Sequence, residues 1–180
     1  MPPRLALCSP NTSGLGIWDD LAGMSWAVSR SAPYHPGVPS PDPHVLTERV
    51  RTFLEEPHFA SLGTAGADGA PHQAIVWYRL DPDGRILLNS RVGRRWPADL
   101  KRDPRLSLAV FWGAEPNRWV GLTGLVDEVV DDVERARDDI VALAHRYDDV
   151  TDSSIASFRS QARVSFLVRV VGVHDHLEDD

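Results

Sequence analysis

The sequence predicts a mainly β (α+β) fold, a six-stranded antiparallel β-barrel with helices packed outside it. Two turn signals of the hairpin type, Asp68-Gly69 and the segment 81–84, separate stretches rich in strand-forming residues. Near the C-terminus hydrophobic and polar residues alternate as in a half-buried strand. No regular succession of strand, helix and strand runs through the 180 residues, so a parallel sheet is not expected.

A helix followed by three strands is predicted for the first half of the barrel. The helix begins at Asp42-Pro43, an N-cap residue before a proline at the first helical position, and it ends before Pro57. Strands over 59–64, 71–80 and 85–90 follow, and the two hairpin turns join them into a meander. The buried stripe of the helix consists of Leu46, Val50, Phe53 and Leu54.

The second half is predicted to begin with a short helix over 97–102 and strands over 106–112 and 119–130. Asp131 and Glu134 have the spacing of a capping box and therefore predict the start of a longer helix. The hydrophobic face of that helix repeats at helical spacing and comprises Val133, Ala136, Ile140, Leu143 and Tyr147.

A weaker helix over about 153–161 leads into the last predicted strand. This strand alternates without a break, which predicts one buried and one polar face. The buried face comprises Val164, Phe166, Val168 and Val170, and the polar face comprises Arg163, Ser165 and Arg169.

Residues 1–43 differ in composition from the rest of the chain. Eight of the 14 prolines lie there, and no helical or strand period persists. Proline removes backbone donors, and the segment 31–43 is too poor in hydrophobic residues to offset the entropy of ordering. We expect a flexible Pro-rich N-terminal tail over 1–43 and one barrel domain over 44–180. Trp18 and Trp26 leave open that the tail docks on the domain or on a partner.

The overall composition excludes several classes of protein. With 26 acidic and 19 basic residues the net charge is −7, which argues against a nucleic-acid-binding protein. No hydrophobic run approaches the roughly 20 residues of a membrane-spanning helix, so no membrane partner is expected. A single cysteine, Cys8, forms no internal disulfide and no multi-thiolate metal site, which favours a reducing, cytoplasmic location.

The densest functional signal lies at residues 90–97, Ser-Arg-Val-Gly-Arg-Arg-Trp-Pro. Three arginines surround a glycine at the end of a strand, directly before a helix. Backbone N–H groups at a helix N-terminus attract anions, and arginine adds bidentate hydrogen bonds suited to phosphate. Trp96 beside them suits a cofactor with a ring system. On the residues alone, the segment is either a phosphate-binding turn or a solvated basic loop.

Other residues carry weaker signals. His174 and His176 lie on one face of a strand, but no third ligand accompanies them, so no metal site is expected. Cys8 has no partner base, which argues against a catalytic thiolate. Arg118 and Trp119 are either substrate contacts or a pair at the barrel rim. The remaining candidates are isolated histidines and an acidic run expected at a strand end and helix N-terminus, namely His58, His72, His145, Asp127, Glu128, Asp131 and Asp132.

Four segments occur in a distinctive order. Residues 59–64 follow a helix, residues 68–72 run into Val76-Trp77-Tyr78, residues 93–96 precede 99–105, and residues 119–124 are followed by acidic residues. In this order they resemble the flavin/deazaflavin oxidoreductases of the pyridoxamine 5′-phosphate oxidase-like split β-barrel, most closely the F420-dependent branch. The resemblance covers about residues 44–173 and implies an FMN-binding split barrel fold.

The resemblance also implies a homodimer with a cofactor site at the subunit interface and a small molecule as substrate. In the family the cofactor ring packs against the second and third strands, and basic side chains before the short helix hold the phosphate. By position, the strand contacts fall on His72, Ala74, Ile75, Val76, Trp77, Ser90 and Arg91, and the phosphate ligands on Arg94, Arg95 and Trp96. Many relatives have lysine at the position of Trp96, so here Arg94 and Arg95 would supply the charge.

Two cofactors, coenzyme F420 and FMN, carry both a phosphate and a tricyclic ring. The Arg-rich segment followed by residues 100–105 is closer to the deazaflavin-using branch. The resemblance therefore implies an F420-dependent oxidoreductase that passes a hydride to a small or mid-sized electrophile with an activated C=C or C=N bond. Because the cofactor carries the chemistry, no catalytic side chain is nominated. The alternatives are an FMN-dependent enzyme of the same fold and a non-catalytic flavin- or deazaflavin-binding module.

Overall fold

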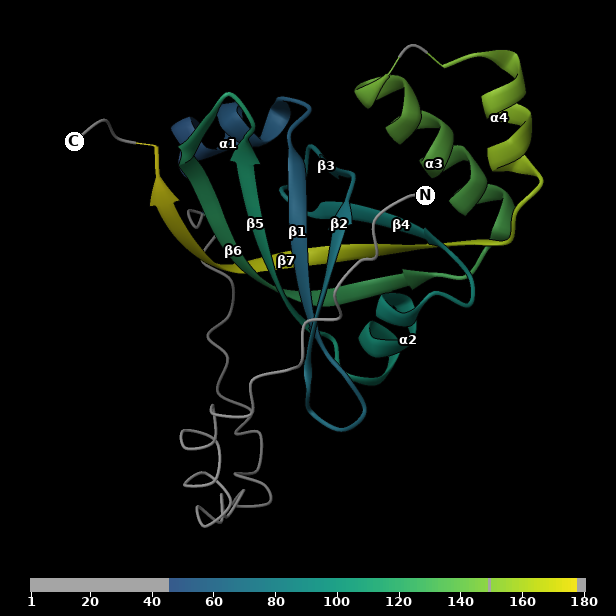
Figure 1. The fold of residues 1–180 in the computed structure, drawn as a ribbon, viewed down its shortest axis with the longest axis horizontal. Helices are drawn as coiled ribbons and strands as arrows, with labels where there is room; N and C mark the ends of the chain where they lie inside the picture. Colours follow the sequence, from purple (N-terminus) through teal and green to yellow (C-terminus); the bar gives the residue numbers. More distant parts are fainter. Residues whose placement is uncertain (1–45, 149, 178–180) are drawn as a thin grey trace, which may run out of the picture. The chain divides into compact units, whose positions relative to one another are not determined.

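The computed structural model describes residues 46–148 and 150–177, and the predicted tail over 1–43 lies outside this part of the chain. Antiparallel strands form one sheet in the order β2-β1-β5-β6-β7-β4-β3. β2 and β3 stand at the two ends of this order, yet only Trp77 separates them in the chain. The sheet therefore has to curl until its ends meet, which produces the half-open barrel in Figure 1.

The mainly β fold with peripheral helices is confirmed, with seven strands in the described residues instead of six. The strands are β1 (Phe59–Ala65), β2 (Pro71–Val76), β3 (Tyr78–Leu80), β4 (Ile86–Arg91), β5 (Arg105–Trp112), β6 (Glu115–Val130) and β7 (Arg163–His176). The helices are α1 (Glu48–Glu55), α2 (Arg95–Arg102), α3 (Val133–Tyr147) and α4 (Asp152–Arg159).

The additional strand arises because the predicted strand over 71–80 bends at Trp77. β2 pairs with β1, whereas β3 pairs with β4. Tyr147 of α3 stabilises the bend, since its hydroxyl accepts a hydrogen bond from the Tyr78 N–H (3.2 Å) and donates one to the His58 carbonyl oxygen (2.7 Å). Its ring also stacks on Trp77, with 5.3 Å between the ring centroids. At the bend the Tyr78 N–H has no partner on a neighbouring strand, and the Tyr147 hydroxyl from α3 takes that place.

Both predicted hairpin turns are confirmed. Gly69 and Gly84 adopt φ angles of 80° and 85°, in the left-handed region that favours glycine. β6 begins earlier than predicted, at Glu115, because Glu115 pairs with Trp112 of β5. β6 and β7 remain paired from Val130 opposite Ser165 to Trp119 opposite His176.

Three helix starts differ from the predictions. The side chain of Thr47, not Asp42, caps α1 by accepting a hydrogen bond from the Val50 N–H (3.3 Å). The helix over 97–102 begins earlier, at Arg95. Asp132, not Asp131, caps α3 by accepting a hydrogen bond from the Arg135 N–H (2.9 Å), and Asp131 forms an ion pair with Lys101 (2.6 Å).

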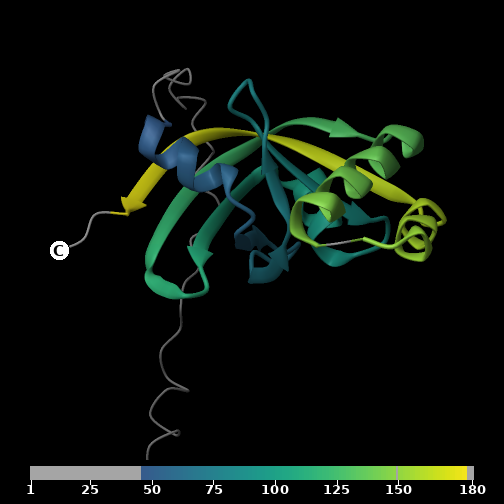
Figure 2. The same ribbon diagram turned by 90° about the horizontal axis from the view of Figure 1, so that it is seen from above.

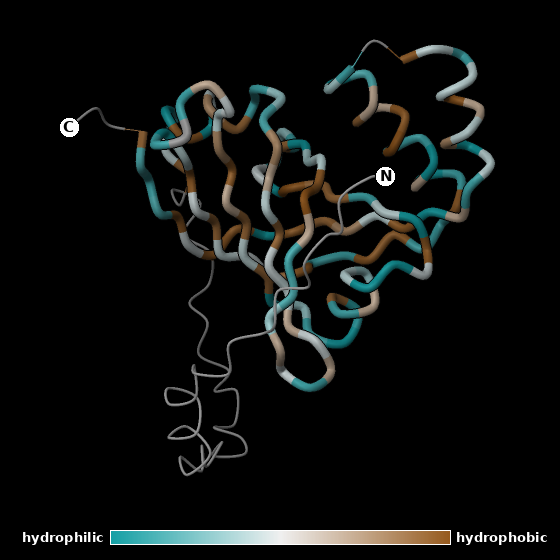
Figure 3. Tube along the Cα trace, in the orientation of Figure 1, coloured by the Kyte–Doolittle hydropathy of each residue, from teal (hydrophilic) through white to brown (hydrophobic). Residues whose placement is uncertain are grey.

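Two clusters of buried hydrophobic side chains lie on the two faces of the sheet and hold the helices against it. The larger one fills the barrel and includes the buried side of α1 and α2. The smaller one, on the other face of β4 and β7, comprises Leu87, Ile140, Leu143 and Leu167, with Trp77, Tyr147 and Phe158 packed against it. Figures 1 and 2 show α1 and the α3–α4 pair on opposite sides of the curled sheet. Hydrophobic stretches follow the strands, whereas the connecting loops are mostly hydrophilic (Figure 3).

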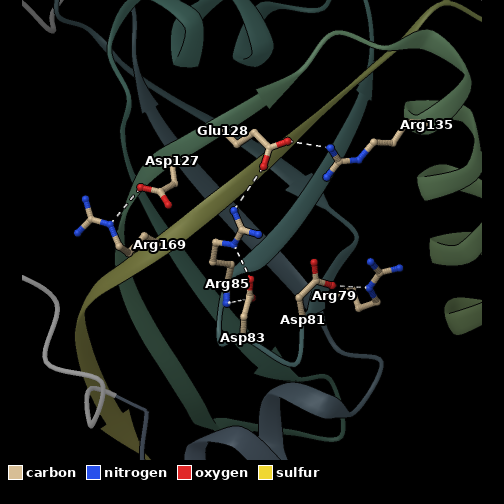
Figure 4. A network of polar contacts seen from close by, with 8 residues as sticks. All are labelled: Arg79, Asp81, Asp83, Arg85, Asp127, Glu128, Arg135 and Arg169. Carbon is tan, nitrogen blue, oxygen red and sulfur yellow. Dashed lines mark hydrogen bonds and ion pairs between the residues drawn. The ribbon is translucent and has the colours of Figure 1, made fainter.

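The acidic run lies at the end of β6 and the start of α3, as predicted, and its carboxylates are paired. Asp127 binds Arg169 at 3.2 Å, and Glu128 binds Arg135 at 2.8 Å and Arg85 at 3.4 Å (Figure 4). These contacts are a surface network that needs no ligand.

Candidate functional site

A cavity of about 290 Å³ lies among residues of β2, β4, α2, α3, α4 and β7. Six of the ten predicted cofactor-binding residues line it, namely Ile75, Val76, Trp77, Ser90, Arg94 and Trp96. Four residues that were not predicted complete the lining, namely Asn89, Ile140, Phe158 and Arg163. The structure therefore brings the middle of β2 and the Arg-rich turn together at one site.

Two buried polar atoms at this cavity have no hydrogen-bond partner in the described part of the chain. They are Oγ of Ser90, a residue 3% exposed, and Nε of Arg163, a residue 7% exposed. Buried polar groups are nearly always hydrogen-bonded in folded proteins. Two residues of the cavity lining therefore have hydrogen-bonding capacity that the described part of the chain leaves unused, and atoms of this kind also occur at Arg118 and Arg146.

The charge around these atoms is positive. Burial lowers the pKa of Arg163 to about 10, and the neighbouring guanidinium groups of Arg91 and Arg94 contribute to the shift. At neutral pH Arg163 therefore remains protonated. No side-chain ion pair joins Arg91, Arg94 or Arg163 to a carboxylate among the residues that the structure describes.

The start of α2 adds to the positive potential. Gly93 turns the chain with φ 88°, and Arg94 is the N-cap residue without a side-chain hydrogen bond to the helix. The first turn contains no acidic residue. Its backbone N–H groups and the positive end of the helix dipole therefore favour an anion at this end.

Trp96 forms part of the cavity wall and contributes no charge to it. The residue is 4% exposed and belongs to the barrel core, where its ring contacts Phe166 with 5.5 Å between centroids. Any phosphate at this site therefore has to be held by its neighbours.

Arg94 and Arg95, predicted together as phosphate ligands, diverge. Arg94 lines the cavity, whereas the guanidinium of Arg95 lies beside Gly66, with its Nε 4.0 Å from Asp99 Oδ2. Arg91 is exposed, and Ala74 packs at the edge of the barrel core. Neither of them lines the cavity.

His72 belongs to a separate polar cluster on buried Asp99. The carboxylate accepts hydrogen bonds from Arg102 (3.0 Å), His72 Nδ1 (3.1 Å) and Thr64 (3.2 Å). Burial alone would raise the pKa of Asp99, but these hydrogen bonds hold it below its ordinary value. His72 lines a different cavity, of about 400 Å³, together with Thr64 and Pro71.

The candidates at the far end of β6 and β7 form a stack of aromatic rings. Trp119 lies on His176, with 4.3 Å between centroids, and His174 lies 4.5 Å from His176. Arg118 contacts Glu115 at 3.5 Å. Within residues 46–148 and 150–177, no group of three potential metal ligands is present.

The other histidines do not enter the cavity. His58 is buried against Phe53, and burial lowers its pKa, whereas His145 is exposed on α3. Cys8 lies outside the described residues. None of the helices in the described ranges is long and apolar enough to cross a membrane.

Sequence reasoning missed Arg163 because the alternation of the last strand assigned it to a polar, solvent-facing side. Its opposite neighbour in the sheet is Arg91, at the end of the Arg-rich segment. Knowledge that β4 pairs with β7 would have placed Arg163 beside the Arg-rich segment, but the sequence does not reveal which strands are neighbours.

The curled antiparallel sheet is that of a split β-barrel protein, and the cavity beside it has aromatic and cationic side chains in its lining. The sequence model of the pyridoxamine 5′-phosphate oxidase family matches residues 46–176, so the chain belongs to this family, as the resemblance implied.

Individual relatives are similar at modest identity. The F420H2-dependent biliverdin reductase of Mycobacterium tuberculosis is 33% identical over 102 residues, covering 57% of this chain and 72% of that protein. A pyridoxine/pyridoxamine 5′-phosphate oxidase of Thermosynechococcus vestitus is 32% identical over 84 residues, covering 47% of this chain but only 39% of that enzyme. The solved structure of an F420 reductase has a TM-score of 0.61 at 24% identity, covering 69% of this chain and 94% of that one. Both of the named sequence relatives are oxidoreductases, and the solved structure shows the same fold.

Proposed function

We propose that the protein is an F420-dependent oxidoreductase that transfers a hydride between the deazaflavin and a small or mid-sized organic electrophile. The observation that carries this proposal is a cavity in which the polar side chains of Asn89, Ser90, Arg94 and Arg163 face aromatic and aliphatic ones, with Ser90 Oγ and Arg163 Nε lacking a partner in the described residues. A ligand that joins a ring system to a phosphate satisfies both properties of the cavity. F420 is such a ligand, and the F420H2-dependent relative supports the choice.

The residues present fit this group. Trp77 provides an aromatic side chain for a ring, the edges of Val76 and Trp96 add hydrophobic wall, and Ser90 and Arg94 provide donors for a phosphate. When bound, F420 supplies a two-electron hydride carrier. The chain's own contribution is to orient the ring and neutralise the phosphate.

Ile140 and Phe158 close the cavity on the side of α3 and α4. Because both are hydrophobic, they exclude water from the ring. The described side chains at the cavity include no carboxylate, histidine or thiol, so we assign no general acid or base to it.

We further propose that the working unit is a homodimer. Ile75 lines the cavity on the edge strand β2 and is nevertheless 64% exposed. A large hydrophobic side chain at the open side of a site is covered when a second copy packs there. The molar mass in solution, measured by light scattering, tests this point, and a monomer over the working concentration range would contradict it.

An FMN-dependent enzyme of the same fold is the second candidate. It is supported by the match to the pyridoxamine 5′-phosphate oxidase family. FMN also joins a tricyclic ring to a phosphate, so the same residues would bind it.

The function is tested with protein purified from a host that lacks deazaflavin. F420H2 is added, and its oxidation is followed by absorbance with a panel of enones, quinones and tetrapyrroles. We expect saturable oxidation with at least one acceptor class. A protein purified with a bound FMN spectrum, and inactive with F420H2, contradicts the F420 proposal. Tight F420H2 binding without oxidation across the panel indicates the non-catalytic binding module instead.

A further inference from the structure

The link between α1 and β1, residues 56–58, is held by side chains from the end of α3. Arg146 donates hydrogen bonds to three successive carbonyl oxygens at the end of α1, those of residues 54–56. The hydroxyl of the next residue, Tyr147, donates to the His58 carbonyl oxygen (2.7 Å). The last carbonyl groups of a helix need partners of this kind, because no further turn supplies them. The α1–β1 link therefore depends on two adjacent side chains of α3.

The Tyr147 side chain also reaches the candidate site. Its hydroxyl lies 3.2 Å from the Tyr78 nitrogen and 3.0 Å from the Tyr78 carbonyl oxygen, and its ring stacks on Trp77 with 5.3 Å between the ring centroids. Trp77 lines the cavity of about 290 Å³. A displacement of the His58 carbonyl oxygen is therefore passed to the cavity wall through one phenol.

The His58 side chain is buried beside charged groups. It is 7% exposed, its ring lies 4.4 Å from the Phe53 ring, and its Nε2 has no hydrogen-bond partner in the described residues. A Glu56 carboxylate oxygen lies 3.2 Å from Nε2, but outside hydrogen-bonding geometry. The charged side chains that face His58 are Glu56 in the same link, Arg118 of β6 and Arg146 of α3. A proton on His58 thus places a third positive charge beside two guanidinium groups.

The neutral form of His58 is the one that this environment favours. Burial lowers the pKa of His58 below its ordinary value of 6.5, the two guanidinium groups lower it further, and Glu56 partly opposes them. Tyr78 and Tyr147 stay neutral, because burial raises the pKa of both hydroxyls. The imidazole therefore gains its proton only as the pH falls below 6.5.

We propose that His58 is an acid-sensitive switch, whose protonation weakens the contacts of Arg146 and Tyr147 with the α1–β1 link and so loosens the Trp77 wall of the cavity. The repulsion acts directly on Arg146, the guanidinium that binds the carbonyl oxygens of this link. The described side chains that line the cavity include no carboxylate and no histidine, so an affinity change between pH 5.5 and 7.5 has to originate outside the lining. The inference rests on the proposed function only in that the cavity binds a ring.

The switch itself is tested without any ligand. Hydrogen–deuterium exchange of the Tyr78 amide, which is bonded to the Tyr147 hydroxyl, is followed by NMR at pH 7.5 and 5.5 and corrected for intrinsic exchange. We expect the corrected rate of the wild-type chain to rise at least about fivefold at pH 5.5, the low end of a coupling between two sites. In His58→Phe it should change less than about twofold. His145→Phe is the matched control and should respond as the wild-type chain does, because His145 is exposed on α3.

Glu56→Gln keeps the test decisive if His58→Phe does not fold. Glu56 is 60% exposed, and its carboxylate raises the pKa of His58. Its replacement should therefore move the exchange response to lower pH without loss of the fold. Thermal unfolding at pH 7.5 verifies that each variant is folded. Equal responses of the wild-type chain and His58→Phe, no response in the wild-type chain, or an unshifted response in Glu56→Gln overturns the switch.

The consequence for the cavity is measured with riboflavin, a ring probe that has no phosphate and does not titrate between pH 5.5 and 7.5. We expect its affinity for the wild-type chain to be at least about fivefold lower at pH 5.5, and that for His58→Phe to change less than about twofold. Equal riboflavin affinities of the wild-type chain at both pH values overturn the connection to the cavity. If riboflavin binds at neither pH, the placement of a ring in the cavity is contradicted, whereas the exchange experiment still decides the switch.

Discussion

Two groups of arginines in this molecule share a side chain but differ in their partners. Arg79, Arg85, Arg135 and Arg169 each contact a carboxylate at 2.7–3.4 Å, as Figure 4 shows. Arg91, Arg94 and Arg163 gather at the cavity end of β4 and β7, and none of them is paired with a carboxylate in the described residues. Each arginine of the first group has a carboxylate partner in the folded chain, whereas the arginines of the second group have none among the described residues.

The partners of a charged side chain therefore indicate function better than its exposure does. Paired arginines at the surface contribute roughly 0–1 kcal/mol each to stability. A buried guanidinium beside two like charges lowers stability, and such an arrangement is typical of binding sites. Since 18 of the 19 basic residues are arginine, composition alone could not separate the two groups.

The largest difference in cofactor affinity is expected between the alanine variants of two adjacent arginines. Arg94→Ala should weaken binding of the phosphorylated cofactor by about 1.5–3 kcal/mol, the value of a hydrogen bond to a charged group. Arg95→Ala should weaken it by less than about 1 kcal/mol, because Arg95 is directed toward Asp99 and lies half-exposed. Isothermal titration of both variants measures the difference. Equal losses would show that the cavity is not where the phosphate binds.

A smaller effect is expected at the Asp99 cluster, and on stability rather than on binding. Asp99→Asn removes the charge that accepts hydrogen bonds from Arg102, His72 and Thr64, and should lower the free energy of unfolding by about 1–3 kcal/mol at pH 7. Urea unfolding measures this loss. Asp127→Asn, at an exposed ion pair, is the control and should change stability by less than about 1 kcal/mol.

The same carboxylate predicts a pH dependence. The folded-state pKa of Asp99 lies below the ordinary value of 3.8 that the unfolded chain keeps. Its contribution is therefore fully present above pH 3.8 and is lost as the pH falls through the lower folded-state value. The stability difference between the wild-type chain and Asp99→Asn should shrink in that acidic range. A difference that stays constant down to the acid transition would contradict the role of the charge.

The smallest effect is expected in the paired group. Arg169→Gln should change the free energy of unfolding by less than about 1 kcal/mol and leave cofactor affinity unaltered, because its partner Asp127 is at the surface. Thermal unfolding and fluorescence titration of the same sample measure both quantities. If Arg169→Gln lowered the cofactor affinity, the paired and unpaired arginines would not differ in their effect on binding.

The sequence predicted those features that depend on local pattern. The turns at Gly69 and Gly84 and the helix stop before Pro57 require only neighbouring residues, and the structure contains all of them. The polar face predicted for the last strand was wrong at Arg163 and Ser165, which are buried because α3 and α4 cover that face of β7. The bend at Trp77 was not predicted, because residues 75–78 are all strand-forming and the group that stabilises the bend, Tyr147, comes from another element.

The residues of the candidate site likewise fall into those that a local sequence pattern predicts and those that it does not. Ser90 and Arg94 lie in one short segment with a recognisable pattern, and both line the cavity. Arg163 was assigned to a polar face, since the alternation of its strand does not reveal that Phe158 and Asn89 cover it. His72 follows its predicted strand but contacts Asp99, a residue whose position depends on how α2 packs.

We have proposed that the cationic, aromatic cavity binds a phosphorylated deazaflavin. The decisive experiment is a titration of the wild-type chain and of the double variant R94A/R163Q with F420, read by the fluorescence of Trp77 and Trp96 at the cavity. We predict saturable quenching for the wild-type chain, and for the folded double variant an affinity lower by about 3–6 kcal/mol. Equal affinities for the two proteins, or no saturable binding of F420 to the wild-type chain, would contradict the claim.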